Sequence, residues 1–216
     1  MANRLALPPL YVILDAALLP SDPVEFLKKL TGAGARLFQY RNKTAPAREV
    51  LQAAQALNLT AWQEGANFLV NDRPDIARLA GTSGVHLGQD DLYVAAARKI
   101  VGAGAIIGIS THNLDEFRSA VKTDADYIAV GPIFQTRSKA NPDPIVGLEL
   151  IREARKLTNK PIVAIGGIIL ERATDVVRAG ADSVAVISDI LAARNPVARV
   201  KQYLEILPTA AQPAAN

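Results

Sequence analysis

Eight short apolar runs recur along the chain, and a longer amphipathic stretch follows each of them. The runs cover residues 10–14, 37–40, 68–70, 85–87, 106–109, 127–130, 162–165 and 184–187. Most are continuously apolar, which is typical of parallel strands buried on both faces. Helical periodicity follows over residues 23–30, 45–64, 75–79, 92–100, 114–121, 148–157, 171–179 and 197–206. Eight strand-then-helix units predict an α/β protein with a closed (β/α)8 TIM barrel.

A doubly wound open sheet is the alternative fold. Such sheets usually carry a glycine-rich phosphate turn after the first strand, but here the first run leads into Asp15 and two alanines. Gly32, Gly81 and Gly180 stand where helices should end. We therefore expect a single barrel domain over residues 1–207, followed by a disordered tail over residues 208–216.

The composition limits the chemistry that is open to the chain. It has no cysteine, which excludes disulfides, a thiolate zinc site and a cysteine nucleophile. The two histidines, His86 and His112, are too few for a multi-histidine metal site. A metal ion would need oxygen ligands, which is the preference of Mg²⁺. The simplest interpretation of His86, inside the fourth strand, is a hydrogen-bonded core residue.

Charge and hydropathy indicate the class of partner. The net charge of +3 comes without a long Lys/Arg run, which argues against nucleic acid and suits small anionic substrates. The first apolar stretch is interrupted by Pro8, Pro9 and Asp15, unlike a signal peptide, and no run is long enough to span a bilayer. The sequence predicts a cytoplasmic protein that does not bind membranes, and it leaves homo-oligomerisation open.

Cationic side chains end the second strand, where the chain runs Gln39, Tyr40, Arg41, Asn42, Lys43. Side chains alternate along a strand, so Gln39, Arg41 and Lys43 share one face. If that face is the mouth of the barrel, two cations converge there and need an anion or a carboxylate. The alternative is that they leave the strand for solvent.

Carboxylates follow the next two strands. Asn71 and Asp72 end the third strand, and Asp91 follows the fourth. Each could instead cap a helix, before Pro74 and before Leu92 respectively. Neighbouring strand ends lie close together in a barrel, so the two aspartates also suit one Mg²⁺.

The remaining strand ends carry features that suit phosphate groups. Ser110 places a hydroxyl after the fifth strand, and a polar loop over residues 131–142 follows the sixth, long enough to act as a lid. Gly166 and Gly167 allow backbone N–H groups close to an oxyanion. Ser188 follows the eighth strand, and the loops after strands seven and eight often bind phosphate in such barrels.

Taken in order, these strand ends resemble those of the thiamine phosphate synthase family, from Gln39 to Ser188. The matching pieces are Gln39-x-Arg41-x-Lys43, Asn71-Asp72, Gly88-Gln89-Asp90-Asp91, Gly131-Pro132-Ile133 through Lys139, and Ile165-Gly166-Gly167-Ile168. Departures are small: Ser138 and Asp90 stand where the family often has Thr and Glu, and Tyr40 and Asn42 differ on the opposite strand face.

The resemblance implies a transferase of thiamine biosynthesis, which condenses hydroxymethylpyrimidine pyrophosphate with hydroxyethylthiazole phosphate and releases pyrophosphate. It assigns the pyrimidine pyrophosphate to Gln39, Tyr40, Arg41, Asn42, Lys43, Asn71, Ser110 and Lys139. It assigns the thiazole phosphate to Thr136, Arg137, Ser138, Gly167, Ile187 and Ser188, and Mg²⁺ to Asp72 and Asp91. Arg41, Lys43, Ser110 and Lys139 are the expected catalytic residues.

Other activities stay open at this point. A thiazole tautomerase-like isomerase of the same superfamily would need neither the aspartate pair nor the cations. A phosphate-binding barrel without catalysis would bind ligands and not turn them over. A Schiff-base aldolase fits less well, because Lys43 and Lys139 lie among partners for anions rather than in an apolar pocket that lowers a lysine pKa.

Overall fold

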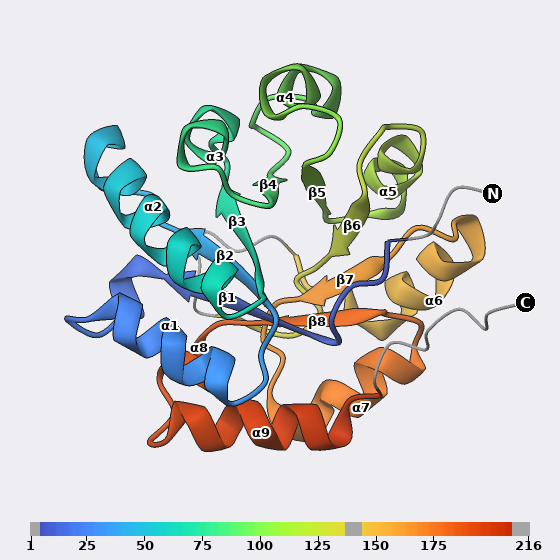
Figure 1. Cartoon of the computed structure of the whole chain (residues 1–216). Helices are drawn as coiled ribbons and strands as arrows, with labels where there is room; N and C mark the ends of the chain where they lie inside the picture. Colours follow the sequence, from blue (N-terminus) through green and yellow to red (C-terminus); the bar gives the residue numbers. More distant parts are fainter. Residues whose placement is uncertain (1–4, 137–143, 209–216) are drawn as a thin grey trace, which may run out of the picture.

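Eight parallel strands close into a barrel, and helices surround it on the outside (Figure 1). The computed structural model describes residues 5–136 and 144–208. The strands follow one another in chain order around the barrel, and β8 pairs with β1 to close it. The predicted (β/α)8 fold is confirmed. The expected tail, apart from Pro208, lies outside the described residues.

Every expected strand and helix is present, with ends that differ from the prediction by at most two residues. The strands are β1 Leu10–Asp15, β2 Leu37–Arg41, β3 Asn67–Asn71, β4 Gly84–Leu87, β5 Ile106–Thr111, β6 Tyr127–Val130, β7 Ile162–Ile165 and β8 Ser183–Val186. The helices are α1 Pro23–Gly32, α2 Ala47–Gln63, α3 Pro74–Ala80, α4 Val94–Val101, α5 Leu114–Val121, α6 Gly147–Leu157, α7 Leu170–Arg178, α8 Ser188–Leu191 and α9 Pro196–Ile206. Two short elements were not predicted, the 3-10 helix η1 Ala16–Leu18 and the single turn α8.

The strands are mostly apolar because each face packs in a different core. Tyr11 and Ile13 of β1 point into the barrel, where they join the smaller cluster. Val12 and Leu14 point outward into the larger cluster between strands and helices. This arrangement places every second strand residue inside the barrel and so decides which side chains reach its mouth.

Local signals fix several helix ends. The carboxylate of Asp22 accepts a hydrogen bond of 2.9 Å from the backbone N–H of Glu25, which caps α1. Gly81 ends α3 in the left-handed conformation, at φ 65°, as its position predicted. None of the helices in the described ranges is long and apolar enough to cross a membrane.

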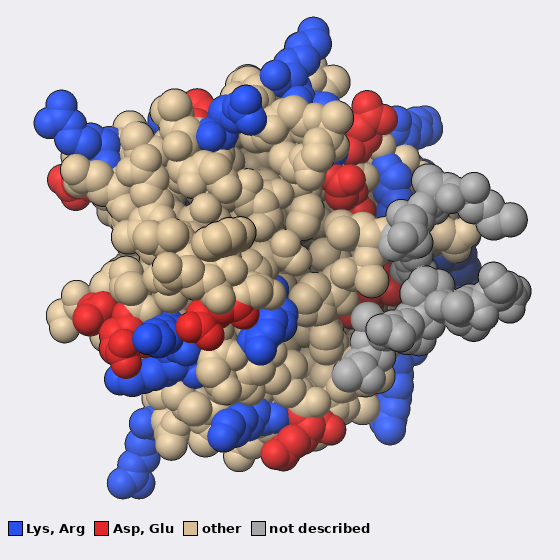
Figure 2. Space-filling model, in the orientation of Figure 1, with Lys and Arg blue, Asp and Glu red and all other residues tan. Residues whose placement is uncertain are grey.

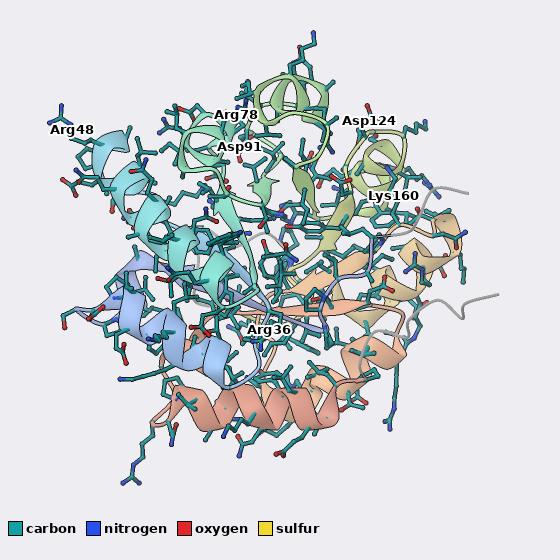
Figure 3. All side chains as sticks on the ribbon, in the orientation of Figure 1. Arg36, Arg48, Arg78, Asp91, Asp124 and Lys160 are labelled. Carbon is teal, nitrogen blue, oxygen red and sulfur yellow. The ribbon has the colours of Figure 1, made fainter. Side chains whose placement is uncertain are left out.

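An arginine-aspartate bracket joins α4 to the start of β6 at the amino-terminal end of the barrel. The guanidinium of Arg98 lies 2.6 Å from Oδ2 of Asp126 and also donates to the carbonyl of Asp124, labelled in Figure 3, at 3.0 Å. Oδ2 of Asp126 accepts a further hydrogen bond of 2.7 Å from the backbone N–H of Ile107. One carboxylate thus ties a helix to two neighbouring strands.

The same bracket recurs two strands later. The guanidinium of Arg155 in α6 lies 2.8 Å from Oδ2 of Asp182, which accepts a hydrogen bond of 2.8 Å from the backbone N–H of Ile162. Lys160, labelled in Figure 3, donates to the carbonyl of Thr123. On the face that Figure 2 shows, basic and acidic side chains are interspersed and do not gather by sign.

Candidate active site

A cavity of about 530 Å³ opens at the carboxyl ends of the strands. The expected site residues that line it are Gln39, Arg41, Lys43, Asn71, Asp72, Ser110, Thr136, Gly167, Ile187 and Ser188. They come from strand ends all around the barrel, so the fold brings together residues that lie far apart in sequence. This is the end of the barrel at which active sites of this fold lie.

Two expected residues of β2 and the loop after it do not line the cavity. Tyr40 points outward and is buried in the core between strands and helices. The side-chain oxygen of Asn42 accepts hydrogen bonds from the backbone N–H groups of Thr44 and Ala45, at 3.1 and 3.0 Å, and so shapes the turn into α2. Strand alternation explains why Tyr40 misses the cavity, and the hydrogen bonds of the turn hold Asn42 away from it.

Both cations at the end of β2 meet a carboxylate. Arg41 forms an ion pair with Asp15, its partner in the register of β1 and β2, and both side chains are largely buried. Lys43 forms an ion pair with Asp72 at the end of β3, and its side chain is half exposed. The sequence analysis did not assign Asp15, although its place at the end of β1 was a usable signal.

The two aspartates expected to bind metal lie beside each other and cap no helix. The cap residue of α3 is Arg73, whose side chain makes no capping hydrogen bond, and α4 begins only at Val94, after Tyr93. Asp72 has a positive φ of 63°, an uncommon conformation that aspartate tolerates better than most residues. Oδ2 of Asp91, labelled in Figure 3, accepts a hydrogen bond of 2.6 Å from the backbone N–H of Gly88.

The electrostatics of this pair fit a divalent cation. The pKa of Asp91 is raised, first because burial disfavours the charged form and next because the carboxylate of Asp72 interacts with it. A cation between two such carboxylates relieves both effects. Within the described ranges no group of three or more potential ligands occurs. Two carboxylates suit Mg²⁺, which fills its remaining positions with water and phosphate oxygens.

The glycines after β7 make room for the loop after β6. Gly167 has a φ of 63°, and a Cβ atom there would lie only 2.3 Å from the carbonyl oxygen of Gln135. At Gly166, with a φ of 98°, a Cβ atom would lie 2.6 Å from Pro132. The backbone N–H of Phe134 donates to the carbonyl of Gly166 at 2.9 Å. Glycine at these positions therefore permits the contact between the two loops.

The short helix α8 is held in place by Asp189. Its Oδ2 accepts hydrogen bonds from the hydroxyl of Tyr203, at 2.7 Å, and from the backbone N–H of Leu170, at 3.2 Å. Burial and the hydrogen bond to Asp189 both raise the pKa of Tyr203, which keeps its proton. The result is that Ser188, the first residue of α8, is fixed at the edge of the cavity on the β7 and β8 side.

A chain of buried polar side chains crosses the barrel below the cavity. Nε2 of Gln39 donates to the hydroxyl of Tyr11 at 2.8 Å, which lies 3.1 Å from the hydroxyl of Tyr127. The hydroxyl of Tyr127 lies 2.8 Å from Nδ1 of His86, and Nε2 of His86 lies 2.8 Å from Oγ of Ser110. His86 is buried and hydrogen-bonded, as expected, but it also lines the cavity.

Sequence reasoning missed Tyr11 and Tyr127. The side chain of His112, the second histidine, also borders the cavity, and its Nδ1 lies 2.6 Å from the carbonyl oxygen of Gly131. The expected residues Arg137, Ser138 and Lys139, and with them the second half of the expected lid, lie outside the described residues.

Comparison with known proteins identifies the family. The thiamine monophosphate synthase family matches residues 10–190. The thiamine-phosphate synthase of Koribacter versatilis is 49% identical over 212 residues, which cover 96% of this chain and 99% of that protein. The thiamine-phosphate synthase of Methanospirillum hungatei is 41% identical over 199 residues, or 92% and 97% of the two chains. A thiamine phosphate pyrophosphorylase from Pyrococcus furiosus has a TM-score of 0.83 and 34% identity, covering 91% of this chain and 94% of its own. The resemblance expected from the sequence is confirmed, and the chain belongs to the thiamine monophosphate synthase family.

Proposed function

We propose that the chain condenses hydroxymethylpyrimidine pyrophosphate with hydroxyethylthiazole phosphate, giving thiamine phosphate and pyrophosphate. The observation that carries this proposal is a single cavity with two different sides. One side holds Arg41, Lys43 and Asp72 at the ends of β2 and β3, and the other holds glycines and a serine at the ends of β7 and β8. Two anionic groups can therefore bind at the same time, one on each side of the cavity.

The pyrimidine pyrophosphate belongs to the cationic side in this proposal. Arg41 and Lys43 face the leaving group, Gln39, Asn71 and Ser110 contact the pyrimidine, and the family resemblance adds Lys139. Asp72 and Asp91 are suited to hold Mg²⁺, which would neutralise charge on the departing pyrophosphate. Since both cations already pair with carboxylates, they are fixed in place before a substrate arrives, which favours stabilisation of the transition state.

The thiazole phosphate belongs to the side formed by β7 and β8. Gly167, Ile187 and Ser188 line that part of the cavity, together with Thr136 of the loop after β6. The resemblance adds Arg137 and Ser138. The contacts of Asp189 with α8, and of the two glycines with the loop after β6, give these groups fixed positions.

The reaction needs no protein nucleophile. The bond between the pyrimidine methylene carbon and the pyrophosphate oxygen breaks, and the electron pair leaves with pyrophosphate. The aminopyrimidine stabilises the positive charge on the methylene carbon, and the thiazole nitrogen forms the new carbon–nitrogen bond. The contribution of the chain is to position both partners and to stabilise the leaving group.

The proposal is tested by mixing the purified protein with Mg²⁺ and either both substrates or one. We expect thiamine phosphate and pyrophosphate in equal amounts only with both. Turnover of the thiazole phosphate alone would favour the isomerase. Tight binding of both ligands without product would favour a phosphate-binding barrel.

Three expectations stay predictions: Mg²⁺ as the metal, a cytoplasmic location, and substrates rather than nucleic acid as partners. The modest net charge of +3 supports the last of them, and the face in Figure 2 shows no gathering of cations of the kind that a nucleic-acid surface needs.

A further inference from the structure

We propose that the buried chain from Gln39 through Tyr11, Tyr127 and His86 is a polarised hydrogen-bond relay that fixes the hydroxyl of Ser110 as a donor toward the cavity. Tyr11, Tyr127 and His86 are positioning residues in this proposal, because they act through Ser110. The inference rests on the proposed function, in which the pyrimidine ring contacts Ser110.

The relay is built across the interior of the barrel. Its members come from β2, β1, β6, β4 and β5, and four of them, Gln39, Tyr11, Tyr127 and His86, are at most 8% exposed. The rings are packed as well as hydrogen-bonded. Tyr11 and Tyr127 meet edge to face at 82°, and His86 stacks on Tyr127 with 5.6 Å between ring centres. Such packing leaves the hydroxyls little freedom to choose other partners.

Gly108 gives an independent indication that β5 is shaped around this relay. A Cβ atom at Gly108 would lie 2.0 Å from Cζ and 2.4 Å from the hydroxyl of Tyr127. The ring of Tyr127 therefore lies directly over the strand that carries Ser110 two residues later. Any side chain at Gly108 would push the ring off the line between Tyr11 and His86.

One end of the relay sets its direction. The amide nitrogen of Gln39 faces Tyr11 and can only donate, so the hydroxyl oxygen of Tyr11 accepts. We infer that Tyr11 gives its own proton to the oxygen of Tyr127, the other hydroxyl within hydrogen-bond distance at 3.1 Å. Both tyrosines keep their protons, because burial raises the pKa of each.

The same donor-to-acceptor direction continues from Tyr127 through His86 to Ser110. In the proposed direction Tyr127 accepts from Tyr11 and donates its own proton to Nδ1 of His86, 2.8 Å away. The neutral imidazole then carries its hydrogen on Nε2 and donates it to Oγ of Ser110. Since Oγ is the acceptor in that bond, the hydroxyl hydrogen of Ser110 points elsewhere, and the cavity is where a ligand can receive it.

This direction selects a chemical class of ligand. A donor at Ser110 suits an unprotonated ring nitrogen of an aminopyrimidine, which is an acceptor. An oxo-pyrimidine of the same shape carries an N–H at the neighbouring ring position and offers a donor instead. A buried site that is built for one polarity discriminates strongly against the other, because a mismatched group loses its partner.

The matched test is Tyr127→Phe, which keeps the ring and removes one link of the relay. The readout that a purely structural role would not move is the tautomer of His86, observed by ¹⁵N NMR of the histidine rings. The chain has only two histidines, and a His112→Asn variant assigns the signals. We expect the Nε2–H tautomer in the native chain, and a change in that signature in Tyr127→Phe.

Kinetics give the second readout. We expect Tyr127→Phe to lower kcat/KM for the pyrimidine substrate about tenfold, the equivalent of one hydrogen bond, and to leave the KM for the thiazole phosphate unchanged. The control is Thr31→Val on α1. It removes a buried hydroxyl that donates a hydrogen bond of 2.9 Å to the carbonyl oxygen of Lys28. It should lower stability and leave both KM values unchanged.

Three results would contradict the proposed relay. An Nδ1–H tautomer in the native chain, an unchanged His86 signal in Tyr127→Phe, or an equal kinetic loss in Thr31→Val would overturn the relay. If Tyr127→Phe does not fold, Tyr11→Phe breaks the preceding link with the same ring retained. If the native chain makes no thiamine phosphate, the proposed function fails, while the NMR measurement still tests the relay because it needs no turnover.

Discussion

Gly167→Ala introduces two costs at the mouth of the barrel, backbone strain and a steric clash. Comparison with a second glycine variant separates them. Gly167 and Gly65 have nearly the same backbone conformation, with φ of 63° and 68°. A Cβ atom at Gly65 meets nothing within 4 Å, whereas one at Gly167 would lie 2.3 Å from the carbonyl oxygen of Gln135. Gly65→Ala is therefore a control for backbone strain alone.

The magnitude follows from these contacts. A left-handed conformation costs an L-residue roughly 1–2 kcal/mol, and both variants carry this cost. Overpacking adds about 1–3 kcal/mol at Gly167 only. In a domain of this size each kcal/mol lowers Tm by about 2–4 °C, so Gly167→Ala should unfold on the order of 5 °C below Gly65→Ala.

The kinetic consequence should be confined to one substrate. The clash pushes the loop that carries Gln135 and Thr136 away from the end of β7, which opens the proposed thiazole phosphate side. We expect a higher KM for the thiazole phosphate and little change for the pyrimidine pyrophosphate. Thermal unfolding and initial-rate kinetics on both variants measure these effects. Equal Tm values and equal KM values in Gly167→Ala and Gly65→Ala would refute the reasoning.

Asp72→Asn and Asp91→Asn should each remove most of the mutual tightening between Mg²⁺ and the pyrimidine pyrophosphate, measured by calorimetric titration; full coupling in either variant would exclude that residue from the metal site. Because the pKa of Asp91 is raised, Mg²⁺ affinity should begin to fall, as the pH is lowered, at a higher pH than for an ordinary aspartate. Asp72→Asn should move this fall to lower pH by removing the neighbouring charge, and Mg²⁺ titrations over a pH series check the direction. Ser188→Ala should weaken thiazole phosphate binding by about 1.5–3 kcal/mol, and an equal loss for both ligands would contradict the division of the cavity.

Periodicity predicted the barrel because each strand is buried on both faces and each helix on one. The same signal cannot detect α8, which is four residues long and has no full period to display. It also cannot decide between a metal ligand and a helix cap at Asp72 or Asp91. That decision depends on the start of α4 at Val94 and on the unusual backbone of Asp72.

The sequence predicted which strand-end residues line the site. It did not predict which side chains contact one another across the barrel. The ion pair of Arg41 with Asp15 depends on the register of β1 and β2, which the sequence does not specify. The hydroxyls of Tyr11 and Tyr127 meet although the residues are 116 positions apart. Each tyrosine fits an apolar strand on its own, so nothing local indicates a polar role.

The brackets at the amino-terminal end of the barrel bear on how the chain can change over evolutionary time. Each joins residues separated by only one strand and one helix, since Arg98 and Asp126 are 28 positions apart and Arg155 and Asp182 are 27 apart. Neither depends on the loops at the opposite end, which line the cavity. Loops at the mouth can therefore acquire substitutions that alter specificity, while the two brackets keep a fixed base under β5 to β8.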